Sequence, residues 1–75
     1  MSDEIQFFSF LLEEYADYKN LTAPEVLKIW DETVLFAKMT LTEYILEKYF
    51  IYHIEALENA FKDIDHLLAT GKPLY

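Results

Sequence analysis

Two short stretches decide the fold of this chain: Leu21-Thr22-Ala23-Pro24-Glu25-Val26 and Met39-Thr40-Leu41-Thr42-Glu43-Tyr44. Each places a threonine three residues before a glutamate, which is the pattern of a capping box. In this motif the threonine side chain and the glutamate side chain each accept a hydrogen bond from the other residue's backbone N–H. Apolar residues flank both boxes at the positions of a hydrophobic staple. The two stretches therefore predict that helices begin near residues 23 and 41.

Helical periodicity extends outward from these two boundaries. Apolar residues recur at helical spacing over residues 3–18, 23–37, 41–52 and 54–69. Ser2 or Asp3 can cap the first segment, and Gly71 followed by Pro73 marks the end of the last one. We therefore expect an all-α fold, a small bundle of three to four helices that forms a single domain over residues 1–75.

The apolar faces of these segments predict which side chains are buried. In the second segment, Val34 and Phe36 share the inner face with Trp30, whereas Leu35 falls outside it, as Leu46 does in the third segment. The last segment is the clearest amphipathic helix, and we expect its polar residues to face the solvent. These polar residues are Glu55, Glu58, Lys62, Asp65 and His66.

The junction at residues 50–54 leaves two alternatives open. The apolar face rotates by roughly 100° between the third and fourth segments, which requires a bend or a break. However, Phe50-Ile51-Tyr52-His53-Ile54 contains no residue that favours a turn. Either His53 closes an irregular turn by bonding to a backbone group, or residues 41–69 continue as one long helix. The long helix would favour an intertwined dimer.

Charge narrows the classes of partner. The chain has 14 acidic residues against six basic ones and a net charge of −8. Nucleic acids and anionic membrane surfaces are therefore unfavourable partners, whereas a basic protein would be attracted. The absence of cysteine, the acidic start and the lack of a long apolar run predict a cytoplasmic protein.

The residue types give little support to catalysis. The chain has no cysteine and a single glycine, so a thiol nucleophile and a glycine-rich phosphate loop are excluded. His53, Asp63 and His66 are the residues from which a metal site could be built. Solvated positions for Asp63 and His66 explain them more simply. We expect no catalytic residue, no metal and no cofactor.

Phe10 breaks the helical pattern most clearly. It lies on the polar side of the first segment, at helical spacing from Glu13, Glu14 and Asp17. An aromatic ring with an acidic rim is typical of an interface centre. The alternative is that a neighbouring helix of the same chain packs on Phe10. Together with the junction, this face gives the candidate interface residues: Phe10, Glu13, Glu14, Asp17, Phe50, Tyr52 and His53.

Three further stretches resemble a family of short bacterial proteins, domain of unknown function 3791. They are Leu12-Glu13-Glu14-Tyr15 with Lys19-Asn20-Leu21-Thr22 ahead of Glu25-Val26, then Tyr44-Ile45-Leu46-Glu47-Lys48-Tyr49, and then His53 followed by Asp63-Ile64-Asp65. The family pattern has a Thr-Gln-like turn after the histidine, where this chain has Ile54-Glu55-Ala56. The resemblance implies an accessory protein encoded beside proteins similar to ADP-ribosyltransferases, and it brings no catalytic residue.

The sequence as a whole predicts a non-enzymatic module for protein–protein interaction. Its partner would be another protein or a second copy of the chain in a dimer; the acidic charge either attracts a basic partner or only keeps the domain soluble. An antitoxin-like role beside a neighbouring gene product suits a small acidic binder. The alternatives are a structural homo-oligomer with no separate partner and a metal-dependent enzyme.

Overall fold

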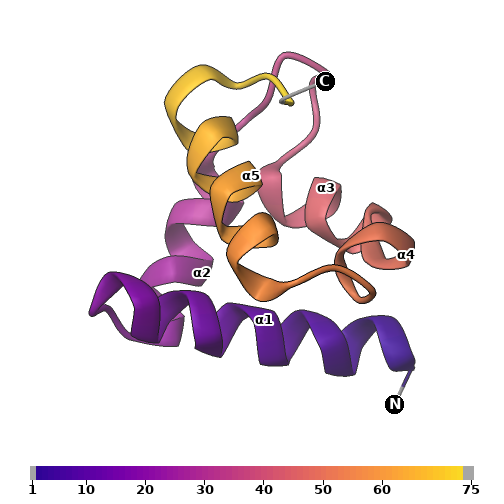
Figure 1. Ribbon diagram of the computed structural model, residues 1–75. Helices are drawn as coiled ribbons and strands as arrows, with labels where there is room; N and C mark the ends of the chain where they lie inside the picture. Colours follow the sequence, from indigo (N-terminus) through magenta and orange to yellow (C-terminus); the bar gives the residue numbers. More distant parts are fainter. Residues whose placement is uncertain (1, 74–75) are drawn as a thin grey trace.

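Five α-helices make up the fold in the computed structural model, which describes residues 2–73. They are α1 (Asp3–Lys19), α2 (Ala23–Glu32), α3 (Leu41–Glu47), α4 (Tyr49–Tyr52) and α5 (Leu57–Thr70). Helix α1 extends beneath the other four, and α5 rises from it toward the loop between α2 and α3 (Figure 1). Within the described part of the chain, the only β-structure is an isolated bridge between Val34 and Thr40. The expected all-α bundle is thus confirmed.

Both predicted capping boxes are present. At α2, the Thr22 hydroxyl and the Glu25 carboxylate each accept the other's backbone N–H at 3.3 Å. At α3, the corresponding bonds between Thr40 and Glu43 measure 3.0 and 3.1 Å. Two hydrogen bonds from Thr40, the larger contribution coming from its backbone N–H and the smaller from its hydroxyl, hold the pKa of Glu43 below its usual range. Local hydrogen bonding therefore fixes where these two helices begin.

The second helix is shorter than the predicted 23–37 because it ends at Glu32. The Thr33 hydroxyl donates to the Ile29 carbonyl, Val34 then forms an extended bridge with Thr40, and a turn follows at residues 36 and 37. Side chains alternate in an extended chain. Leu35 is therefore buried, whereas Val34 and Phe36 are 67% and 70% exposed, the reverse of the sequence prediction.

Of the two alternatives for the junction, the structure has the break, although its limits differ from the expected ones. The helix expected over 41–52 is interrupted at Lys48, and the last helix begins at Leu57 instead of residue 54. His53 bonds through Nδ1 to the Tyr49 carbonyl at 2.5 Å, as expected of a residue that closes an irregular turn. Residues 41–69 therefore do not form one long helix.

The core lies between α1 and the four helices above it. Trp30 is at its centre, with its ring against Phe8 and Tyr15 at centroid distances of 5.7 and 5.5 Å. The buried apolar residues are Leu11, Tyr15, Ala16, Val26, Trp30, Leu35, Leu41, Ile45, Tyr52, Ala60, Ile64 and Leu67. Over residues 2–73, none of the helices has the length and apolar character needed to cross a membrane.

Candidate functional site

The predicted interface residues of α1 share its outer face. Phe10 is 48% exposed, and its ring contacts Phe7 at a centroid distance of 6.4 Å. Glu13 and Asp17 are exposed beside it, and Glu14 is half-buried. The alternative in which another helix covers Phe10 is therefore not observed among the described residues.

The predicted residues at the junction separate into two groups. Phe50 is 74% exposed, and His53 is exposed as well. Tyr52, in contrast, is only 2% exposed, so its ring belongs to the core and is not available to a partner. The adjacent Ile54, which was not among the predicted interface residues, is 77% exposed.

Ring contacts connect α1 to α4 and to His53, which follows α4. Phe7 meets Tyr49 edge-on at 5.8 Å, and His53 stacks on Tyr49 at 4.3 Å. Phe50 in turn contacts Tyr49 at 5.6 Å. We call the five rings that form this connected set, Phe7, Phe10, Tyr49, Phe50 and His53, the aromatic patch. Edge-on and stacked ring pairs are favourable arrangements, and each of the two exposed phenylalanines contacts one of the less exposed rings, Phe10 with Phe7 and Phe50 with Tyr49.

The possible metal ligands do not converge. His53 lies in the aromatic patch, whereas Asp63 and His66 belong to α5. Burial raises the pKa of Asp63, with a smaller opposing effect from His66. Across residues 2–73, there is no group of three histidine, aspartate or glutamate side chains that could hold a metal ion.

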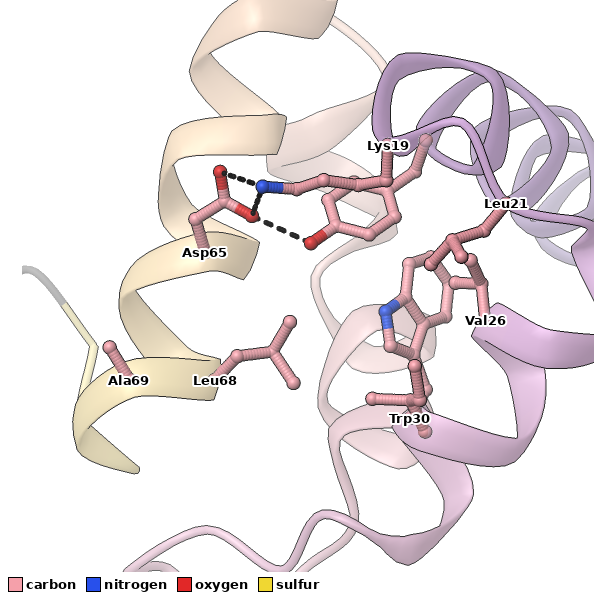
Figure 2. A pocket seen from close by; sticks show the side chains of 9 residues that line it. Lys19, Leu21, Val26, Trp30, Asp65, Leu68 and Ala69 are labelled. Carbon is pink, nitrogen blue, oxygen red and sulfur yellow. Dashed lines mark hydrogen bonds and ion pairs between the residues drawn. The ribbon is translucent and has the colours of Figure 1, made fainter.

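A pocket of about 500 Å³ lies between the end of α1, α2 and α5 (Figure 2). Its walls are mostly apolar and include the side chains of Leu21, Val26, Ile29, Leu68 and Ala69. No pattern in the sequence predicted this pocket, because its walls come from three separate segments.

One edge of the pocket carries a polar cluster. The Tyr15 hydroxyl donates to Asp65 at 2.6 Å, and Lys19 pairs with the same carboxylate at 3.0 Å (Figure 2). Burial, followed by the bond to Asp65, raises the pKa of Tyr15 well above its usual range. Asp65 was expected to be a solvated residue of the outer face, but it joins α5 to α1. The one-turn spacing of Tyr15 and Lys19 was the available signal for a shared partner.

The opposite wall contains a donor without an acceptor. Trp30 is 0% exposed, and its indole Nε1 is buried without a hydrogen-bond partner. The nitrogen is on the edge of the ring that faces α5 and Leu68 (Figure 2). Leaving such a buried group unpaired costs about 1–3 kcal/mol. The pocket thus combines apolar walls, a paired polar edge and one unused N–H donor.

Comparison with known proteins gives one match. The family model described as protein of unknown function (DUF3791) matches residues 6–70, which is most of the chain. No curated protein and no solved structure matches it.

Proposed function

Because the chain belongs to the family of proteins of unknown function DUF3791, we propose its role from its own surface: it is a non-enzymatic module that binds a basic protein partner. The observation that carries this proposal is the aromatic patch, in which Phe10 and Phe50 remain 48% and 74% exposed. Aromatic side chains, phenylalanine included, are enriched at the cores of protein–protein interfaces.

Acidic side chains on the same helix favour a basic partner. Glu13 and Asp17 are exposed on the face of α1 that carries Phe10, in a chain with a net charge of −8. Opposite charges around an apolar centre accelerate encounter and select against wrong partners. A second copy of the chain would bring the same carboxylates toward one another, so a separate partner is favoured over a homo-oligomer.

The test is capture of the partner by tagged protein, with two matched variants. Phe50→Ser removes a ring of the patch, and Phe36→Ser removes an equally exposed ring, 70% against 74%, outside it. We expect the unchanged chain and the Phe36→Ser variant to retain a bound protein at low salt. We expect the Phe50→Ser variant to lose it. The resemblance of the sequence makes products of adjacent genes the first partners to test.

Light scattering tests the alternative in which the chain forms a homo-oligomer. We expect a monomer when no partner is present, because self-association brings together two chains of net charge −8. An oligomer that dissociates on Phe10→Glu would overturn the proposal in favour of self-association. Equal loss of the captured protein with Phe36→Ser and Phe50→Ser would also contradict it, because binding would then not depend on the patch.

A further inference from the structure

We infer that the pocket between α1, α2 and α5 binds an uncharged, largely apolar small molecule whose one hydrogen-bond acceptor receives the Trp30 indole N–H. This site is separate from the aromatic patch, since none of the five patch rings lines the pocket. The inference therefore does not depend on the proposed partner.

The size and composition of the pocket suit a small ligand. Its volume of about 500 Å³ falls within the 300–1,000 Å³ that is usual for such sites. Leu21 and Ile29 are 40% and 42% exposed at its walls, so the cavity is accessible from solvent. Apolar walls with few polar groups are typical of pockets that bind small molecules.

The hydrogen-bonding groups define the polarity of the ligand. Asp65 is occupied by the Tyr15 hydroxyl and by the Lys19 ammonium group, so this edge already has its partners. Trp30 Nε1 is the donor that has none. A ligand that satisfies the pocket therefore contributes one acceptor and is otherwise apolar.

The charges of the chain determine which net charge the ligand can carry. The chain carries 14 acidic residues against six basic ones, and the Asp65 carboxylate is at the edge of the pocket. The net charge of −8 would repel an anionic ligand. Lys19 and Asp65 form an ion pair at 3.0 Å that has no net charge, so it leaves no cation free to attract an anion, and the repulsion comes from the net charge of the chain. An uncharged carbonyl is thus a better acceptor here than a carboxylate.

Access to the indole N–H requires one side chain to move. The nitrogen is shielded from solvent, and Leu68 extends from α5 toward it (Figure 2). Leu68 is half-buried and packs against the core, so a ligand must replace the contacts that the Leu68 side chain loses when it changes rotamer. The ligand then takes the place of Leu68 beside the indole ring.

Three probes of nearly equal shape test the inference. Acetophenone has a carbonyl acceptor, α-methylstyrene has a CH₂ group in its place, and benzoate is the anionic analogue. Trp30 is the single tryptophan, so its indole N–H gives one resonance in a ¹H–¹⁵N spectrum. We expect acetophenone to shift that proton downfield in a saturable manner, with a Kd about three- to tenfold lower than that of α-methylstyrene or benzoate.

Two variants provide controls. Trp30→Phe removes the donor, and we expect it to bring the affinity for acetophenone down to that for α-methylstyrene. Phe10→Glu alters the aromatic patch, and we expect it to leave probe binding unchanged. If Trp30→Phe does not fold, the three probes on the unchanged chain still decide the matter.

Three results would overturn the inference. Equal affinity for acetophenone and α-methylstyrene would show that the indole N–H does not take part. Tighter binding of benzoate would exclude an uncharged ligand. Absence of any saturable shift at the Trp30 resonance would mean that the pocket does not bind ligands of this class.

Discussion

Helices α2 and α3 begin very differently from α4 and α5. The first two start at complete capping boxes, whereas Lys48 and Ala56, which precede α4 and α5, provide no side-chain cap. The uncapped region also exposes Phe50 and Ile54, which are 74% and 77% accessible.

The difference shows which forces define each region. The starts of α2 and α3 are specified by bonds between residues three apart. The junction instead depends on the contact of Tyr49 with Phe7 of α1 and on the bond from His53 to the Tyr49 carbonyl. Sites that depart from local folding rules are frequently functional, which agrees with the proposed role of the aromatic patch.

The largest expected effect on stability compares a substitution in the core with one at the junction. Trp30→Ala empties the centre of the core, and we expect it to lower the free energy of unfolding by about 3–5 kcal/mol. Phe50→Ala removes an exposed ring, and we expect a change within about 0.5 kcal/mol. Urea denaturation followed by circular dichroism measures both values. A cost well above 1 kcal/mol for Phe50→Ala would mean that its ring is covered in solution.

An intermediate effect tests the caps directly. Thr40→Ala removes a cap, and we expect a loss of about 1 kcal/mol of unfolding free energy, whereas Ala56→Ser adds one and should gain up to about 1 kcal/mol. Thermal unfolding of both variants measures this. Ala69→Ser, at an exposed position in the same helix, controls for the serine itself. No gain from Ala56→Ser would show that the start of α5 is already satisfied.

The smallest effect concerns Glu55, just before α5. Its Oε1 atom is buried without a partner, and burial, followed by the nearby Asp63, raises its pKa above 4.5. Ionisation of Glu55 is therefore less favourable in the folded chain than in the unfolded one. The resulting loss of stability is fully present above the folded pKa and disappears as the pH falls below 4.5. We expect Glu55→Gln to raise the Tm at pH 7 and to have no such effect near pH 4.

A matched variant separates this local effect from the change in net charge. Glu13→Gln removes the same charge from an exposed position of α1. If both variants raise the Tm equally, relief of general repulsion explains the gain and the burial of Glu55 does not.

Part of the candidate site could be predicted because it depends on a single helix. Phe10 falls among acidic residues at helical spacing, so the pattern of α1 identified it as a candidate, and the structure decided that no neighbouring helix covers it. Tyr52 was included in the interface because it is close in sequence to Phe50, and its burial beside Leu67 of α5 is a result of tertiary packing. Asp65 and the Trp30 N–H could not be identified, because their roles arise from contacts between separate helices.

The sequence by itself determined the all-α class, the acidic surface and the starts of α2 and α3, because these depend on charge and on bonds within one helical turn. The tertiary structure decided the rest. It ended α2 at Glu32 and thereby buried Leu35 while exposing Phe36. It also joined Tyr15 to Asp65 across 50 residues and so formed the edge of the pocket. Such contacts depend on how the helices pack, which no local pattern specifies.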